Sequence, residues 1–165
     1  MKIFPVKTAT PAVAKAIEIL LGDLSSRGLA FGADQLQEIV AAPLTTLYLA
    51  LEPNDTPAEE SNSPQGTNAP TDETAGAEIV GMFTLAACKL PTGTKVWLED
   101  VVVAHSYQGK GLGRTLVEHA VAEARCLYPG STLMLTSRPS RLAANHIYAQ
   151  TMQSKETNVY TLALD

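Results

Sequence analysis

The sequence predicts an α+β domain in which a mixed sheet carries helices on both faces. Three observations lead to this class. Segments of strand composition and segments of helical periodicity alternate in the order β α α β β β α β α β. The three consecutive strands favour an antiparallel meander, and the later strands, separated by helices, favour crossovers. A length of 165 residues suits one domain, predicted to span 1–165.

The first elements follow from capping residues and periodicity. Residues 2–6 form a short edge strand. Thr10 has the position of an N-cap and Pro11 that of the first helical residue. The helix that follows repeats apolar residues on one face: Val13, Ile17, Leu20, Leu21 and Leu24. A second, short helix is predicted over 33–40 and a β-branched, aromatic strand over 45–51.

An acidic insert is predicted between two strands. Residues 53–76 are rich in Pro, Asn, Ser, Thr, Glu and Gly and have little to bury, which predicts disorder. The strand over 79–87 then returns, so the insert expands the turn of a hairpin at small entropic cost. Residues 52–78 contain seven acids and no Lys or Arg. The rest of the chain contains ten acidic and twelve basic residues, so its net charge is nearly neutral.

Composition argues against several functional classes. No cluster of Lys and Arg indicates a nucleic-acid partner, and no basic amphipathic helix or long apolar run indicates a membrane. The N-terminus has no signal-peptide core, which predicts a cytoplasmic protein. Cys88 and Cys126 have no metal-binding spacing and are expected to be buried free thiols, and no metal is predicted.

The second half of the chain contains the functional signal. Its predicted elements are a strand over 96–103, a glycine loop over 109–113, a helix over 112–127, a strand over 132–136, a helix over 140–150 capped by Ser140, and a final strand over 157–164. Glycines let a loop wrap a ligand closely, and the helix that follows presents unpaired N–H groups and a positive dipole end. Strand, glycine loop and helix together predict a phosphate cradle, with Lys110 and Arg114 at its rim.

Two common phosphate loops do not fit. A Walker A loop needs Ser or Thr after Gly-Lys, but Gly111 stands there. A Rossmann loop needs a third glycine where this chain has Arg114, and its next strand ends in Ser137-Arg138 rather than in an acid.

The pattern that fits is Gln108-x-x-Gly111-x-Gly113. It resembles the pyrophosphate loop of the GNAT superfamily of acyl-CoA-dependent N-acyltransferases, in a small and mostly uncharacterised branch. The strand 98–103, the helix after the loop and the segment 136–148 also look like that family. The resemblance implies a mixed sheet of about six to seven strands with an antiparallel N-terminal meander.

The resemblance also implies acetyl-CoA as cosubstrate. Backbone groups of Val101, Val102 and Val103 would pair with the pantetheine arm, and a backbone N–H near Val101 would polarise the thioester carbonyl. The pyrophosphate would be held by the following residues: Gln108, Gly109, Lys110, Gly111, Leu112, Gly113 and Arg114.

Four further side chains are candidates. Tyr148 matches the family tyrosine that protonates the departing thiolate; the alternative is a tyrosine packed in the core. Glu99 and Asp100 are expected to point to opposite faces of their strand, and either can act as general base, directly or through water; the alternative is a paired structural carboxylate. Asn145 is a candidate pantetheine contact or a solvent-facing helix residue.

Together these features predict an N-acetyltransferase that acts on a primary amine of a small molecule or peptide. The alternative is a non-catalytic acyl-CoA-binding or regulatory domain with the same fold. Two departures from the family pattern favour the alternative: Arg141 replaces an Asn seven positions before Tyr148, and 149–153 lack the Gly-Phe turn. The oligomeric state stays open, with a homodimer as one alternative, since many members of the family are dimers.

Overall fold

The computed structural model describes residues 1–25, 28–53 and 77–164. They form two compact units, 1–135 and 136–165, and each is described by itself. The predicted insert lies outside the described residues except for Pro53, which ends a strand. The prediction of one domain over 1–165 stays a prediction.

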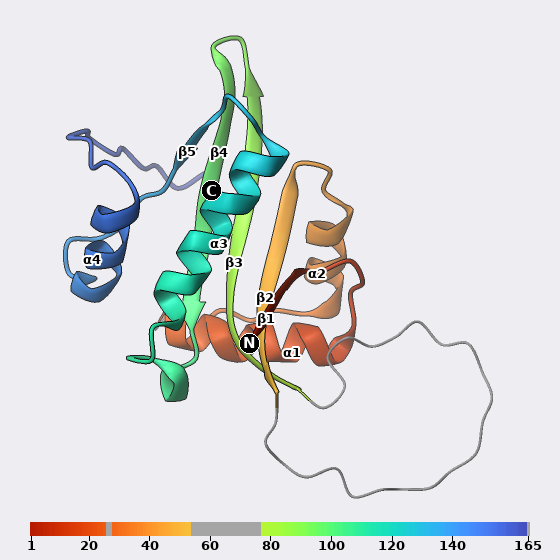
Figure 1. Cartoon of the computed structure of the whole chain (residues 1–165). Coiled ribbons are helices and arrows are strands. Elements are labelled where there is room, and N and C mark those ends of the chain that lie inside the picture. Colours follow the sequence, from red (N-terminus) through yellow and green to blue (C-terminus); the bar gives the residue numbers. More distant parts are fainter. Residues whose placement is uncertain (26–27, 54–76, 165) are drawn as a thin grey trace, which may run out of the picture. The chain divides into compact units, whose positions relative to one another are not determined.

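The first unit contains a five-stranded mixed sheet (Figure 1). Its strands are β1 (Lys2–Pro5), β2 (Thr45–Pro53), β3 (Ala77–Leu90), β4 (Gly93–Val103) and β5 (Thr132–Met134), in that spatial order. β1 to β4 pair antiparallel, and β5 pairs parallel to β4. The predicted fold class and meander are thus confirmed.

Local sequence explains where the helices begin. They are α1 (Pro11–Leu24), α2 (Ala33–Ala41), α3 (Leu112–Leu127) and, in the second unit, α4 (Leu142–Thr151). The Thr10 hydroxyl accepts the N–H of Val13 at 3.2 Å, which confirms the predicted cap of α1. At α2, the Gln35 side chain accepts the N–H of Gly32 at 2.9 Å. α4 begins two residues after Ser140, with Arg141 at its N-cap and no side-chain cap, so the predicted Ser140 cap is wrong.

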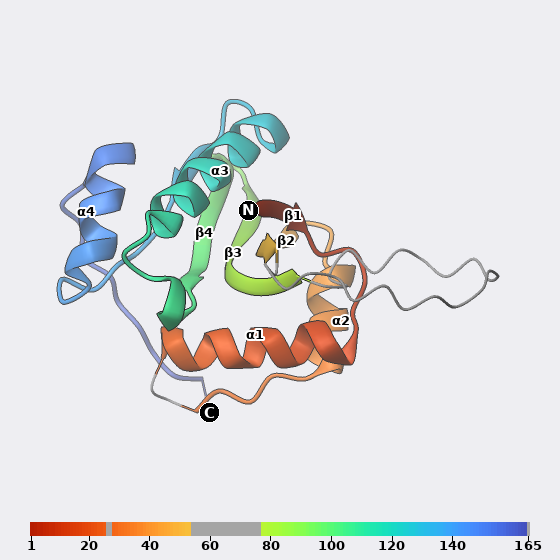
Figure 2. The same cartoon turned by 60° about the horizontal axis from the view of Figure 1, so that its bottom comes forward.

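The sheet separates two apolar layers. Figure 2 shows the helices on its two sides. α1 and α2 cover one face and α3 covers the other. Side chains alternate along β2: Leu47 and Leu49 pack with α1 and α2, whereas Tyr48 and Ala50 pack beneath α3. Both layers contain completely buried side chains. In the layer beneath α3, the Phe83 ring stacks on the Tyr48 ring with centroids 4.6 Å apart.

Gly81 of β3 lies close to both β4 and α3. A Cβ there would lie 2.9 Å from the Val102 carbonyl oxygen and 3.1 Å from Cδ1 of Leu116. At Gly22 in α1, a Cβ would meet no atom within 4 Å. We therefore expect Gly81→Ala to destabilise the fold by about 1–3 kcal/mol through overpacking. The same change at Gly22 should stabilise it by about 1 kcal/mol through helix propensity.

Thermal unfolding of both variants measures this difference. The two melting temperatures should move in opposite directions, each by about 2–4 °C per kcal/mol for a domain of this size. A shift of the same sign in both variants would contradict the close approach at Gly81.

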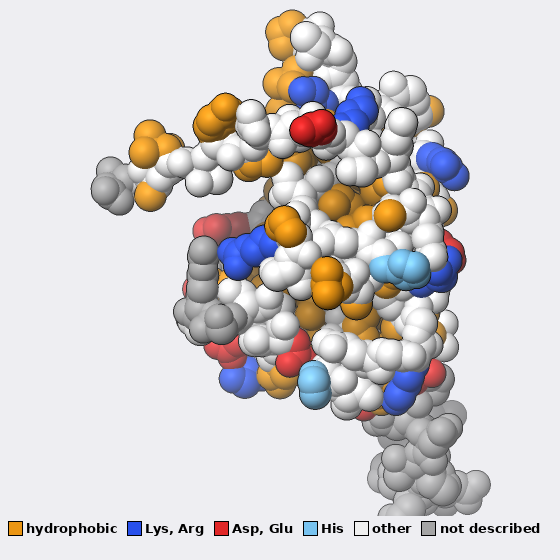
Figure 3. All heavy atoms as spheres, turned by 90° about the vertical axis from the view of Figure 1, so that its left-hand side faces the viewer, with side chains coloured by type: hydrophobic (Ala, Val, Ile, Leu, Met, Phe, Trp, Pro, Cys, Tyr) orange, Lys and Arg blue, Asp and Glu red, His pale blue; other side chains and the backbone are white. Residues whose placement is uncertain are grey.

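The predicted final strand is absent. Residues 152–164 form neither helix nor strand, so the described sheet has five strands rather than six or seven. The apolar side chains of Val159, Tyr160, Leu162 and Leu164 are exposed (Figure 3). Alternation predicts which side chains would share a face, but a strand also needs a partner for its hydrogen bonds, and local sequence does not supply one.

Candidate functional site

The glycine loop joins β4 to α3 through backbone that only glycine adopts easily. Gly109 has φ 76° and Gly111 has φ 86°, and Gly111 is the left-handed N-cap of α3. A Cβ at either residue would meet no atom within 4 Å, so conformation, and not crowding, requires glycine there. The space beside the loop is therefore open to a ligand.

Backbone amides line this loop. The N–H groups of Tyr107, Gln108 and Arg114 donate to backbone carbonyls. In the described part of the chain, those of residues 109–113 donate to none, although they are consecutive and lead into the positive end of α3. Such an array suits an anionic ligand such as a phosphate. Phosphate binding by this loop stays a prediction.

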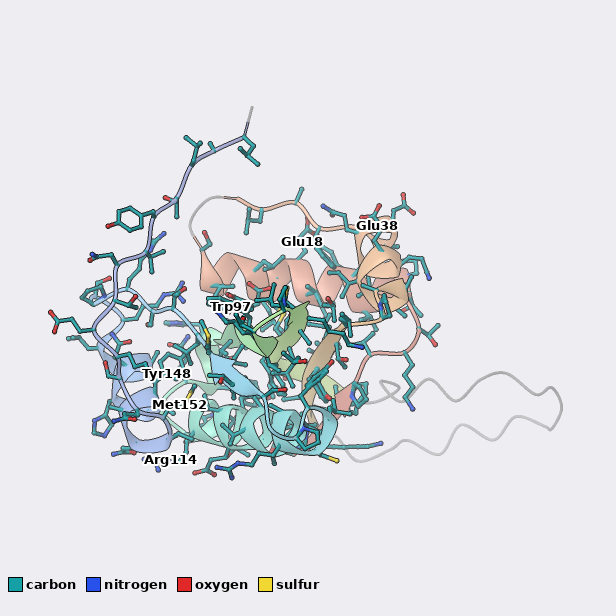
Figure 4. All side chains as sticks on the ribbon, turned by 90° about the horizontal axis from the view of Figure 1, so that it is seen from above. Glu18, Glu38, Trp97, Arg114, Tyr148 and Met152 are labelled. Atoms are coloured by element: carbon teal, nitrogen blue, oxygen red, sulfur yellow. The ribbon has the colours of Figure 1, made fainter. Side chains whose placement is uncertain are left out.

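Two cations stand at the rim of the loop. The Lys110 ammonium lies 4.5 Å from the centroid of the Tyr107 ring. Arg114, in the first turn of α3, lies 4.0 Å from Glu118 in an exposed i,i+4 pair (Figure 4). Both side chains remain near enough to the loop to add positive charge.

Beside the loop, β4 has an open edge. Its parallel pairing with β5 ends at Trp97↔Met134, and from Leu98 to Val103 none of the described strands pairs on that side. The Ala104 N–H donates to Val80 of β3 at 2.9 Å. Backbone groups alternate along a strand, so those of Val101 and Val103 face the open edge. The Gln108 side chain donates to the Val103 carbonyl at 3.1 Å and thereby braces the loop against this strand.

A β-bulge interrupts β4 at Asp100. Asp100 is the only described non-glycine residue with positive φ, at 52°, and the register with β3 shifts between Met82 and Thr84. Leu98 packs beneath α3, and so do Val101 and Val103 rather than the residues that strict alternation would place there. Asp100 is thus an inserted residue, and the alternation of faces breaks between it and Val101. The expectation that Glu99 and Asp100 point to opposite faces stays a prediction.

The two carboxyl groups at the bulge are electrostatically unusual. Partial burial raises the pKa of Asp100. Partial burial and the neighbouring Asp100 charge raise the pKa of Glu99. Both side chains still reach solvent, so they combine increased basicity with access.

These shifts predict how stability depends on pH. A carboxyl with a raised pKa binds its proton more tightly in the folded chain, so its contribution to stability is complete below its ordinary pKa and is lost as pH rises through the folded value. We expect Glu99→Gln to melt at a higher temperature than the parent chain at pH 7, because the amide carries no charge. At a pH below 4.5, the ordinary value for Glu99, the two proteins should converge. An unchanged difference across this range would contradict the raised pKa.

The second unit holds the remaining candidates. Tyr148 lies half-buried in α4 (Figure 4). The Asn145 Nδ2 donates to the carbonyls of Arg138 at 2.9 Å and Pro139 at 3.4 Å, which closes the turn before α4. The first unit therefore brings the glycine loop, the open edge and the two carboxylates together, while Tyr148 and Asn145 share one helix of the other unit.

Distant residues that the sequence analysis missed hold the loop. The Asp23 carboxylate of α1 accepts the N–H of His105 at 3.0 Å. The Tyr107 hydroxyl donates to Glu78 of β3 at 2.8 Å. Sequence separations of 82 and 29 residues left no local signal for either contact.

Other features of the described residues bear on alternative functions. Cys88 and Cys126 are exposed free thiols, so the expectation that they are buried is wrong. Among the residues that the structure describes, no group of three or more His, Cys, Asp or Glu side chains could hold a metal ion. No helix in this part of the chain has the length and apolar character to cross a membrane.

Comparison with known proteins places this arrangement in a family. The sequence model of the Acetyltransferase (GNAT) family matches residues 34–152. A putative acetyltransferase from Agrobacterium tumefaciens superposes with a TM-score of 0.73 at 17% identity, over 99% of this chain and 100% of that one. An aminoglycoside acetyltransferase from an uncultured soil metagenomic sample, solved with sisomicin, gives 0.72 at 14% identity, over 99% and 95%.

A third solved structure, glucosamine-6-phosphate N-acetyltransferase from Arabidopsis thaliana, gives a TM-score of 0.64 at 17% identity, over 98% of this chain and 99% of that one. No curated protein sequence matches the chain significantly. At these identities the solved structures show the fold alone, and the family match over most of the chain identifies the sequence. The chain belongs to the GNAT family of acetyltransferases.

Proposed function

We propose that the protein transfers the acetyl group of acetyl-CoA to a primary amine. The observation that carries this proposal is the row of open amides over 109–113 beside the open edge of β4. A pyrophosphate needs several N–H donors and a positive helix end, and an extended pantetheine arm with amide groups needs an unpaired strand edge. The residues present fit both parts of the cosubstrate.

Each predicted binding residue has a role in this proposal except Val102, whose backbone groups face β3. Residues 109–113, with Lys110 and Arg114, hold the pyrophosphate, and Gln108 fixes the loop by its bond to Val103. The backbone groups of Val101 and Val103 pair with the pantetheine arm, and the Val101 N–H polarises the thioester carbonyl. Asn145 is assigned to the same arm. No covalent enzyme intermediate is required, because the site positions the amine for direct attack.

Proton transfer completes the reaction. The amine nitrogen forms a bond to the acetyl carbon, and the carbon–sulfur bond breaks. Glu99 or Asp100 accepts the proton that the amine loses, directly or through water, and Tyr148 donates a proton to the departing sulfur. The raised pKa of each carboxyl suits a base, because a carboxylate of ordinary pKa holds a proton too weakly near neutral pH.

The class of acceptor is proposed from what the acceptors of similar proteins have in common. The names of similar proteins indicate aminoglycosides, glucosamine-6-phosphate and ribosomal-protein alanine as acceptors. An amine is common to all three. We therefore assign a primary amine on a small molecule or a peptide to this chain.

Thermal stability with acetyl-CoA is the first test. Ligand at about 100 times its Kd should stabilise the fold by roughly 2.7 kcal/mol, or several degrees for a chain of this length. NADH and ATP at the same concentration serve as controls. A shift with acetyl-CoA alone supports the proposal, and no shift would contradict it.

A panel of amines then separates enzyme from binding domain. Release of free CoA thiol that depends on an added amine supports acetyl transfer. Binding of acetyl-CoA without turnover of any amine would favour the non-catalytic domain.

A further inference from the structure

Tyr107 contacts two parts of the first unit at once. Its hydroxyl donates to Glu78 Oε2 at 2.8 Å, and the Lys110 ammonium lies 4.5 Å from its ring centroid. Glu78 is the second residue of β3, and Tyr107 ends the short 3-10 turn that precedes the glycine loop. One side chain therefore joins the sheet to the only lysine of the loop.

The backbone of Tyr107 is also fixed. Its N–H donates to the Ala104 carbonyl at 2.8 Å, and the following Gln108 is bonded through both backbone and side chain. The ring is held at its backbone end by this turn and at its hydroxyl end by Glu78. It thus forms a rigid platform on which the Lys110 side chain rests.

The three groups strengthen one another. A phenol that donates to a carboxylate becomes more electron-rich, and an electron-rich ring attracts an ammonium more strongly. The same carboxylate attracts the positive charge through space. A lysine on a flexible four-carbon stem is thereby held in a small region before any ligand arrives.

Lys110 is held beside the open amides of the glycine loop. Lys110 lies between Gly109 and Gly111, at the rim of the five open amides. An ammonium ordered in advance avoids the entropic cost of ordering when an anion binds. Arg114 differs, because its guanidinium lies near Glu118 on the exposed surface of its own helix.

We propose that Tyr107, anchored by Glu78, is a positioning residue that holds the Lys110 ammonium ready for the pyrophosphate of the cosubstrate. This inference rests on the proposed acetyl-CoA site. It predicts that Tyr107 contributes to acetyl-CoA binding only when Lys110 is present. A tyrosine with a merely structural role would contribute equally with and without Lys110.

The test is a thermodynamic cycle on acetyl-CoA affinity, measured by titration calorimetry. Lys110→Met should raise Kd about tenfold, since it removes a charge-assisted contact to phosphate. Tyr107→Leu should raise Kd about three- to fivefold, as expected for loss of a partly exposed cation–π contact. In the Lys110→Met background, Tyr107→Leu should change Kd less than about twofold.

Conservative and control variants sharpen the result. Lys110→Arg should keep most of the affinity, because a guanidinium also rests on a tyrosine ring. Lys89→Met removes a positive charge from the β3–β4 hairpin and should leave Kd unchanged. If Tyr107→Leu does not fold, as judged by loss of its melting transition, the same cycle is measured with Glu78→Ala in its place. Glu78 is an exposed strand residue, so this substitution should leave the fold intact.

The outcomes separate the inference from the proposed function. Failure of the parent chain to bind acetyl-CoA would overturn both. Binding by the parent chain, with equal costs of Tyr107→Leu in the presence and absence of Lys110, would overturn the positioning role and leave the acetyl-CoA site standing. A cost that disappears with Lys110 supports the inference.

Discussion

Gly111→Glu is expected to abolish acetyl-CoA binding, with a rise in Kd of at least about a hundredfold. The new side chain would start from an N-cap whose Cβ direction is open and would place a carboxylate beside the amides of 109–113. That carboxylate would occupy the donors that we propose for the pyrophosphate and would repel its charge. Removing one or two such charge-assisted hydrogen bonds accounts for a change of about a hundredfold. Calorimetric titration of acetyl-CoA measures the effect.

Gly130→Glu is the matched control. Gly130 has φ 77° and no atom within 4 Å of its Cβ position, so the substitution adds the same charge and a similar backbone strain. It lies beyond the C-terminal end of α3, where a helix leaves carbonyl groups open rather than N–H groups. Loss of binding in both variants would point to general destabilisation, and unchanged affinity of Gly111→Glu would remove the cosubstrate assignment.

Much of the fold could be predicted because its signals are local. The Thr10 cap with Pro11, and the apolar periodicity of α1 and α3, specify helices without reference to the rest of the chain. The hairpin between β3 and β4 is likewise local, because only Pro91 and Thr92 separate the paired residues Leu90 and Gly93. The strand expected over 157–164 failed because strand formation depends on a distant partner.

The site was predicted in part for the same reason. The glycine loop is visible in six consecutive residues, since positive φ at Gly109 and Gly111 requires that residue type. The bulge was missed because it is set by pairing, where Asp100 and Val101 together oppose Phe83. Aspartate tolerates left-handed backbone better than most residues, so Asp100 was itself a weak indication of a bulge. The strand-like composition around it favoured a regular strand instead.

The anchors of the loop were invisible for a different reason. Asp23 and Glu78 lie on α1 and β3, and their partners lie in the segment 105–107. In a sequence, such carboxylates resemble any solvated acid. Only the folded chain shows that two of them hold the segment that leads into the glycine loop.

Tyr148→Phe is expected to lower kcat by about a hundredfold while Kd for acetyl-CoA changes less than about threefold. The change removes one hydroxyl and keeps the ring, so the packing of α4 is preserved. In the proposed mechanism the hydroxyl donates a proton as the carbon–sulfur bond breaks, and such general-acid assistance contributes roughly 10²–10⁴-fold. An interaction made only as the bond breaks affects turnover and leaves ground-state binding intact.

Tyr160→Phe supplies the control for that experiment, because it removes a tyrosine hydroxyl from the same unit at a side chain that is 88% exposed. Its kcat should match that of the parent chain. The pH–rate profile adds a second readout. If Tyr148 is the acid, kcat of the parent chain should decline at high pH, and this decline should disappear in Tyr148→Phe. Equal kcat for Tyr148→Phe and the parent chain would show that Tyr148 packs without donating a proton, and water would then be the remaining donor to the sulfur.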